Sequence, residues 1–176
     1  FAVAMELTKL MNGEFHFSHD KEDKAFCRVR FTFIINEETR EEERPLVSVI
    51  GRTILLVEDN ELNMEIAEFI LRKEGMDVIR AWNGKEALER FEASAPGEIS
   101  VILMDLVMPV MDGFEASRSI RALEREDAKN VVIVALTASD YEEDAKKCRL
   151  AGMNEHLSKP LDTGNLMRVI HKYIKF

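Results

Sequence analysis

An apolar run that stops at a single carboxylate constrains this chain more than any other feature. Residues 99–113 have the sequence ISVILMDLVMPVMDG. Such a run without polar alternation predicts a β-strand buried on both faces, which ends at Asp105 because Pro109 offers no N–H donor. Asp112 and Glu115 then predict the start of a helix. Asp105 is therefore either a turn aspartate or a functional group at the carboxyl end of a parallel strand, where open α/β sheets bind ligands.

Composition excludes several classes of protein. The chain has 176 residues, of which 46% are hydrophobic and 32% charged, and these proportions are typical of a globular protein. A net charge of −9 argues against nucleic-acid binding. We expect no membrane contact by this segment, because no apolar run is long enough to span a bilayer. The two cysteines fit no metal or redox motif, so we expect a cytoplasmic location. The first residue, Phe1, indicates a piece of a longer polypeptide, whose remainder could be anchored in a membrane.

The N-terminal part differs in pattern from the rest. Residues 1–35 predict a small α+β unit, a helix followed by an antiparallel hairpin, because helical apolar spacing gives way to two alternating runs around a charged turn at 20–23. Residues 36–51 hold five glutamates before Pro45 and show no apolar periodicity. They predict an acidic linker.

From residue 52 to residue 176, strands alternate with helices. Strands are expected at 53–57, 78–81, 99–105, 131–136 and 156–158. A helix follows each of them, and in the first helix Leu62, Ile66, Phe69 and Ile70 are expected to face inward. The pattern predicts an α/β, flavodoxin-like fold: a five-stranded parallel sheet of order 2-1-3-4-5 with helices on both faces. The short second and fifth strands suit its edges.

The polar residues that could bind a metal or take part in a reaction all lie at the ends of predicted strands. Glu58 and Asp59 follow the first strand, Asp105 ends the third, and Thr137 and Lys159 follow the fourth and fifth. In the predicted sheet they meet at one edge. Three unpaired carboxylates would raise one another's pKa values, and Mg²⁺ would relieve their repulsion. Asp105 is the candidate nucleophile for phosphoryl transfer, with Lys159 and Thr137 available to hold phosphoryl oxygens.

Four motifs carry a family resemblance over residues 52–174: VEDNELN at 57–63, MDLVMPVMDG at 104–113, LTA at 136–138 and LSKP at 157–160. With them the chain resembles the receiver domain of two-component signalling proteins, in the form attached to hybrid histidine kinases. The resemblance implies phosphoryl transfer from a phosphohistidine to Asp105. The donor would be a kinase domain or a histidine phosphotransfer protein, and a homodimer stays open.

The same resemblance assigns roles to individual residues. It implies that Asp59, Asp105 and the Val107 carbonyl hold Mg²⁺, that Glu58 acts mostly through water, and that the Lys159–Pro160 peptide bond is cis. Thr137 and Lys159 would hold the phosphoryl group. The family usually places Tyr or Phe three residues before the lysine, where this chain has His156. We therefore expect a conformational switch through Thr137 and His156 that differs from the usual aromatic one.

Residues 1–35 resemble the truncated end of a histidine kinase ATP-binding domain, although the glycines usual in its second hairpin strand are absent. The parent protein would then be a protein-histidine phosphotransferase. This chain alone would act as a phosphoacceptor, limited to self-phosphotransfer and autodephosphorylation. No phosphate-binding loop of the GxxxxGK[ST] or GxGxxG type occurs, so we expect no ATP binding.

Three rival interpretations are weaker, and a stand-alone response regulator stays open. An aspartate-nucleophile phosphatase would need an acid two residues after Asp105, where Val107 stands. A flavin-binding module would need a hydroxyl-rich first loop in place of Glu58 and Asp59. His19, in Ser18-His19-Asp20, lies at a strand end and not on the helix that a phosphoacceptor histidine requires.

Overall fold

Parallel strands and helices alternate through most of the residues that the computed structural model describes, which are 14–19, 25–30, 49–138 and 142–174. The chain divides into two units, residues 1–43 and 44–176, and each is described by itself. Among the described residues, no helix is long and apolar enough to cross a membrane.

The first unit contains the expected antiparallel hairpin. Strands β1 (Glu14–His19) and β2 (Ala25–Arg30) pair so that Glu14 lies opposite Arg30 and His19 opposite Ala25. His19 therefore ends a strand, as the sequence predicted. The helix expected before the hairpin, and the expected strand residues 31–35, lie outside the described residues.

The second unit is built on one parallel sheet. Its strands are β3 (Thr53–Val57), β4 (Asp77–Ala81), β5 (Ile99–Asp105), β6 (Val132–Thr137) and β7 (Glu155–Ser158). Their order is β4-β3-β5-β6-β7 and every neighbouring pair is parallel. This confirms the predicted order 2-1-3-4-5, with the second and fifth strands at the edges.

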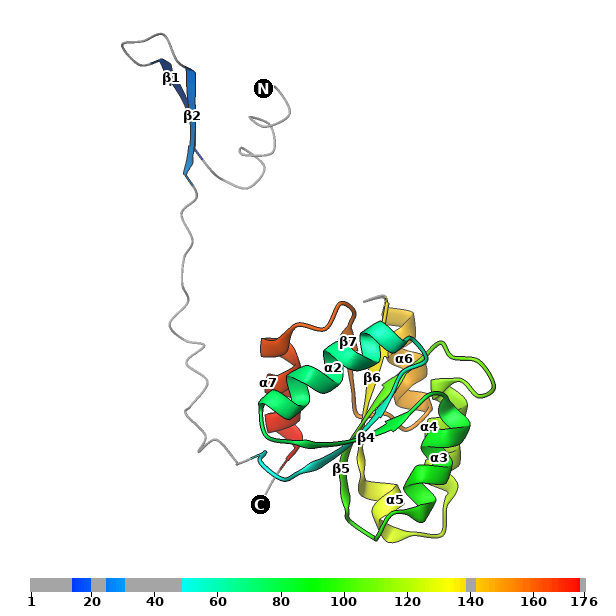
Figure 1. Cartoon of the computed structure of the whole chain (residues 1–176). Helices are drawn as coiled ribbons and strands as arrows, with labels where there is room; N and C mark the ends of the chain where they lie inside the picture. The colour runs from blue at the N-terminus through cyan, green and yellow to red at the C-terminus, as the bar shows by residue number, and fades with distance from the viewer. Residues whose placement is uncertain (1–13, 20–24, 31–48, 139–141, 175–176) are drawn as a thin grey trace. The chain divides into compact units, whose positions relative to one another are not determined.

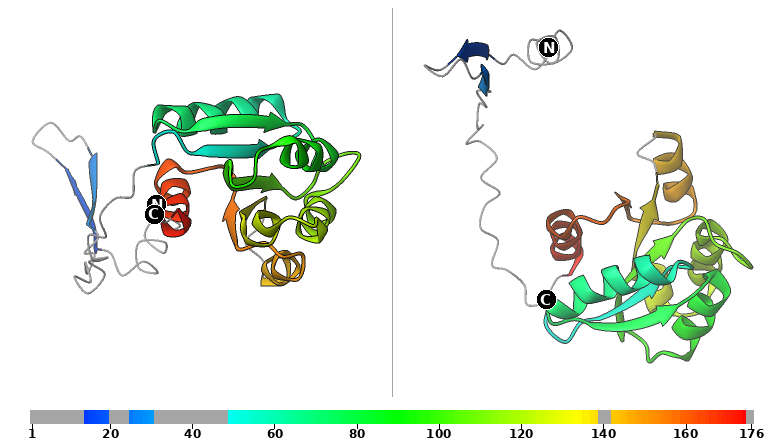
Figure 2. Two further views of the ribbon diagram at one scale, coloured as in Figure 1. Left: turned by 90° about the horizontal axis from the view of Figure 1, so that it is seen from below. Right: turned by 45° about the horizontal axis from the view of Figure 1, so that its top comes forward.

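Helices cover both faces of this sheet, as predicted. On one face lie α2 (Glu61–Lys73) and α7 (Thr163–Tyr173) (Figure 1). On the other lie α3 (Gly84–Ala93), α4 (Gly113–Ala122), α5 (Glu126–Asn130) and α6 (Glu142–Leu150). The same division into layers is visible after the molecule is turned (Figure 2).

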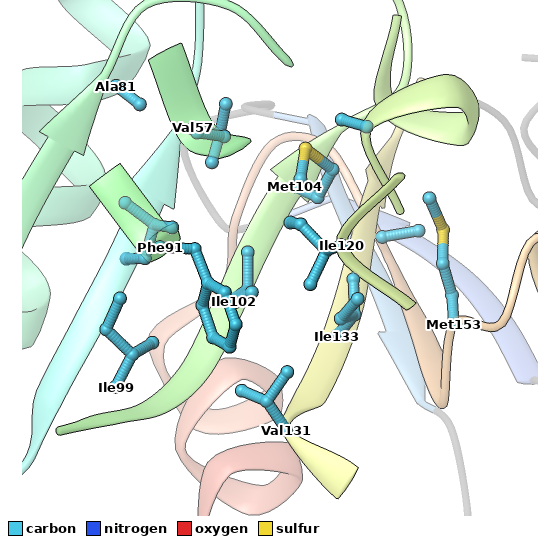
Figure 3. Packing of buried hydrophobic residues seen from close by; sticks show 14 of the residues in the cluster. Val57, Ala81, Phe91, Ile99, Ile102, Met104, Ile120, Val131, Ile133 and Met153 are labelled. Carbon is cyan, nitrogen blue, oxygen red and sulfur yellow. The ribbon is translucent and has the colours of Figure 1, made fainter. Parts of the chain in front are cut away.

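Alternate residues of the strands separate the core into two clusters. Leu55, Ile102 and Met104 belong to the cluster beneath α3 to α6, whereas Leu56 and Leu103 belong to the one beneath α2 and α7. Figure 3 shows Phe91 and Ile120, from two of the covering helices, close to the strand residues of the first cluster. Because β5 is buried on both faces along most of its length, its carboxyl end is rigidly placed.

The prediction for the inward face of α2 was wrong. Leu62, Ile66 and Phe69 are exposed, and only Ile70 packs partly against the core. The helix instead buries Met64, Ala67, Glu68 and Leu71. Both sets follow helical spacing, and the glutamate within the second set concealed the true inward face.

Two arginines explain how Glu68 can face inward. Arg72 on the same helix and Arg80 on strand β4 both form ion pairs with its carboxylate. Burial would raise the pKa of Glu68, but the two guanidinium groups outweigh burial and the pKa lies below its ordinary value. A buried charge is tolerated when it is paired in this way.

Helix α5 was not predicted, because its five residues have no apolar periodicity. Its position is fixed by Arg125, whose Nη1 lies 2.7 Å from the Phe91 carbonyl and whose Nη2 lies 2.7 Å from an Asp127 carboxylate oxygen. Asp127 also accepts a hydrogen bond from the Gly97 N–H at 2.9 Å. The Arg125 guanidinium lowers the pKa of Asp127 to about 2. This network joins the end of α3 to α5.

We expect Asp127→Asn to lower the stability of the fold at pH 7 by about 1 kcal/mol, because it removes an ion pair that solvent screens only in part. The folded pKa of about 2 lies below the ordinary value of 3.8. The charged carboxylate therefore stabilises the fold above about pH 4, and this contribution is lost as the pH falls toward 2. Urea unfolding at pH 7 and pH 3 should show a difference from wild type that shrinks at pH 3. Asp77→Asn, at an exposed position of β4, serves as the matched control, and a difference that keeps its size at pH 3 would contradict the assignment.

Candidate functional site

Backbone packing fixes the position of Asp105. The chain leaves β5, and the Gly113 N–H returns to donate to the Leu106 carbonyl at 3.1 Å. A Cβ at Gly113 would collide with the Asp105 carbonyl oxygen, so only glycine permits this approach. Asp112 caps α4 by accepting from the Glu115 N–H at 2.7 Å, as the sequence predicted. The Asp105 side chain is thereby held, buried, at the edge of the sheet.

Glu58 and Asp59 reach the same place from the end of β3. Single carboxylate oxygens of Glu58, Asp59 and Asp105 all lie within 4.8 Å of one another. Glu58 and Asp105 are buried, whereas Asp59 is exposed. The three predicted carboxylates therefore meet at the carboxyl edge of the sheet, with one of them open to solvent.

Lys159 provides the positive charge that this cluster requires. Its Nζ lies 2.6 Å from Glu58 Oε2 and 2.8 Å from Asp105 Oδ2. Burial alone would lower the pKa of Lys159, but the hydrogen bonds that its ammonium group donates to the Asp105 and Glu58 carboxylates outweigh burial and hold the pKa above its ordinary value. The Lys159–Pro160 bond is cis, as the resemblance implied, and the Lys159 N–H donates to the Thr137 carbonyl at 2.7 Å.

The other predicted site residues are Thr137 and Val107, which line a pocket with Asp105, and His156, which does not. Thr137, Val107 and Lys159 line one pocket together with Asp105. The Val107 backbone nitrogen lies 3.4 Å from Asp105 Oδ1, and residue Val107 is 82% exposed. His156 is not in the pocket lining; it is half-buried in β7 opposite Ala135 of β6. Because Ala135 belongs to the cluster beneath α3 to α6, His156 lies on that face of the sheet.

Two residues near the site were missed in the sequence. Asn63, in the first turn of α2, donates from Nδ2 to Glu58 Oε1 at 2.9 Å. The motif VEDNELN includes this residue, but spacing alone does not indicate which carboxylate its side chain contacts. Val110 has a φ of 71° and an exposed side chain. A left-handed valine is strained, and no pattern in the sequence predicts it.

The donor set fits a hard divalent cation. Mg²⁺ prefers carboxylate oxygens, a few protein ligands and several waters. Glu58, Asp59 and Asp105 supply carboxylate oxygens at one point, and the exposure of Asp59 leaves room for water. Without a cation, Lys159 alone among the groups described above partly neutralises the buried pair of Glu58 and Asp105.

Comparison with known proteins agrees with this geometry. Residues 54–171 match the model of the response regulator receiver domain family. The chain is 35% identical over 136 residues to hybrid signal transduction histidine kinase L of Dictyostelium discoideum, covering 77% of this chain and 8% of that protein. It is 42% identical over 131 residues to hybrid kinase B of the same organism, covering 69% and 6%. The chain thus spans less than a tenth of the length of these kinases.

Solved structures of receiver domains are also similar to this chain. The receiver domain of a sensor histidine kinase from Pseudomonas aeruginosa, with magnesium coordinated in its active-site cleft, matches with 39% identity and a TM-score of 0.63 over 70% of this chain and 97% of that one. The Saccharomyces cerevisiae receiver domain of Ssk1, co-crystallised with the histidine phosphotransfer protein Ypd1, matches with 34% identity and a TM-score of 0.64, covering 71% and 90%.

Gly113→Ala tests the backbone packing beneath Asp105. The added Cβ has no space beside the Asp105 carbonyl, so we expect a loss of stability of about 1–3 kcal/mol from overpacking. Thermal unfolding measures it. Gly164→Ala is the control, because its Cβ would lie 3.2 Å from the Asp162 side chain, a contact that a surface group can relieve. Equal unfolding temperatures for the two variants would contradict the proposed constraint.

Proposed function

Because the chain belongs to the response regulator receiver family, we propose that residues 52–176 take a phosphoryl group from a phosphohistidine onto Asp105, with Mg²⁺ bound. One observation carries this proposal: Asp105 ends the central strand with Glu58 and Asp59 oxygens within 4.8 Å and Lys159 Nζ at 2.8 Å. A carboxylate placed among two acids and a lysine, at the edge where parallel sheets bind ligands, is suited to phosphoryl transfer.

The positions of these groups support a direct transfer to Asp105. An oxygen of Asp105 attacks phosphorus, the bond from phosphorus to the histidine nitrogen breaks, and that nitrogen keeps the electron pair. A bound Mg²⁺ would neutralise charge on the phosphoryl oxygens, and Asp59, Asp105 and the Val107 carbonyl would hold it, with Glu58 acting through water. Lys159 would move its contact from the Asp105 carboxylate to a phosphoryl oxygen, which is a charge-assisted hydrogen bond.

The switch would start at Thr137, which ends β6 and lines the pocket beside Asp105. If its hydroxyl turns toward the phosphoryl group, the end of β6 would move with it. His156 lies on the sheet face beneath this part of the molecule, and it would occupy space that Thr137 vacates. His156→Tyr should therefore leave phosphorylation intact and change the coupling to a partner.

The partner would be a protein that carries a phosphohistidine, either the kinase domain of the same hybrid kinase or a separate phosphotransfer protein. A related receiver domain has been crystallised with such a protein. Leu62, Ile66 and Phe69 form an exposed apolar stripe on α2, and this helix begins two residues after Asp59. The stripe therefore starts three residues after Asp59, at the end of α2 that is nearest in the chain to the carboxylates. Phosphotransfer from an ATP-consuming kinase would place this segment in the cytoplasm.

Asp105→Asn tests the phosphoacceptor. With acetyl phosphate and Mg²⁺, we expect the wild-type chain to gain one phosphoryl group, and Asp105→Asn or removal of Mg²⁺ with EDTA to abolish the gain. Intact-mass spectrometry measures the product. Asp77→Asn is the matched control, since Asp77 begins β4 opposite Thr53, at the amino ends of the strands, whereas the site lies at their carboxyl ends. Phosphorylation that persists in Asp105→Asn would refute the proposal.

Leu62→Ala tests the apolar stripe. We expect it to slow transfer from phosphorylated yeast Ypd1 by about tenfold, because a buried leucine contributes roughly 1.5 kcal/mol or more to an interface. Transfer from acetyl phosphate should not change, since this donor needs no docking surface. The control is Leu150→Ala, another exposed leucine, at the end of α6. Equal rates of protein-dependent transfer in the two variants would show that the stripe is not the docking surface.

A further inference from the structure

We propose that Asn63 is a positioning residue that holds Glu58 in place for the metal. The inference rests on the proposed function, because it concerns how readily the carboxylate cluster accepts Mg²⁺. It goes further by assigning a role to a residue that lies outside the set predicted from the sequence.

The two oxygens of Glu58 have different partners. Oε1 accepts the hydrogen bond from Asn63 Nδ2 at 2.9 Å, and Oε2 lies 2.6 Å from Lys159 Nζ. Glu58 is only 2% exposed. Solvent therefore has little access to replace either partner, and loss of a partner from a buried charged group is costly.

The backbone brings Asn63 to this position. Asn60 caps α2, and its side chain accepts from the Asn63 N–H at 3.1 Å. In an ordinary capping box, the side chain at the position of Asn63 would bond back to the N–H of the cap residue. Here the Asn63 amide donates instead to Glu58, on the loop that precedes the helix. The start of α2 and the carboxylate cluster are thereby linked directly.

The consequence concerns competition for Glu58. When Asn63 donates to Oε1, the charge of Glu58 is shared between a neutral amide and Lys159. Without the Asn63 amide, Lys159 is the remaining one of these two partners of Glu58. A tighter ion pair between Lys159 and Glu58 would oppose Mg²⁺ binding, because the ammonium group and the cation compete for the same carboxylate. Asn63 therefore favours metal binding by keeping Glu58 from pairing with Lys159 alone. Groups that orient metal-binding residues in this way typically change metal affinity by about 10–100-fold.

Mg²⁺ titration of the full chain tests the proposal without measuring phosphorylation. Trp82 is the single tryptophan of the sequence. It follows Ala81, whose carbonyl accepts the Glu58 N–H at 3.1 Å, so its fluorescence should report on the site, and calorimetry gives an independent Kd. We expect Asn63→Ala to raise the Kd for Mg²⁺ about tenfold. In a Glu58→Gln background, the same substitution should have no further effect.

Asn165→Ala is the matched control. Asn165 occupies the same position in the first turn of α7, where its N–H donates to the Asp162 cap at 2.8 Å. It should leave the Kd unchanged, and thermal unfolding should show that both variants are folded. Equal Mg²⁺ affinity in Asn63→Ala and wild type would overturn this inference alone. So would a Kd for Mg²⁺ that Asn63→Ala raises as much in the Glu58→Gln background as in wild type. A wild-type chain that binds no Mg²⁺ would overturn the proposed function as well.

Discussion

Repulsion among three carboxylates at one edge of the sheet is the constraint on which the site depends. Glu58, Asp59 and Asp105 come close only because two neighbouring parallel strands end side by side, and both strands are buried in the core. Lys159 relieves part of this repulsion by pairing with the two buried members. The fold thus places three carboxylates where a cation can bind, and it pairs the two buried ones with the side chain of Lys159.

Different polar contacts hold the helices on the two faces of the sheet. On one face, Glu68 of α2 forms ion pairs with Arg72 and with Arg80 of β4. On the other face, Arg125 joins the end of α3 to α5. Helix α6 is secured at its far end, where Ser117 donates to the Ala151 carbonyl and Arg121 to the Gly152 carbonyl.

The sequence predicted the strand order and the meeting of three carboxylates at the carboxyl ends of the strands, because both follow from where strands end. Buried runs terminated by Glu58, Asp105, Thr137 and Lys159 determine which side chains meet once the strand order is known. The face of α2 could not be predicted, since two stripes have helical spacing and the correct one contains Glu68, whose pairing with Arg80 depends on the fold. Helix α5 and the contact of Asn63 could not be predicted for the same reason. Each depends on a partner that the local sequence pattern does not reveal: the Phe91 carbonyl for Arg125, next to α5, and Glu58 for Asn63.

We propose that Asp105, and no other residue, accepts the phosphoryl group. Its most direct test is chemical mapping on the unmodified sequence. The phosphorylated chain is reduced with borohydride, which converts an aspartyl phosphate to homoserine, and the digest is sequenced by mass spectrometry. We expect homoserine at position 105 alone. Homoserine at position 59, or a stable phosphate on a histidine, would contradict it.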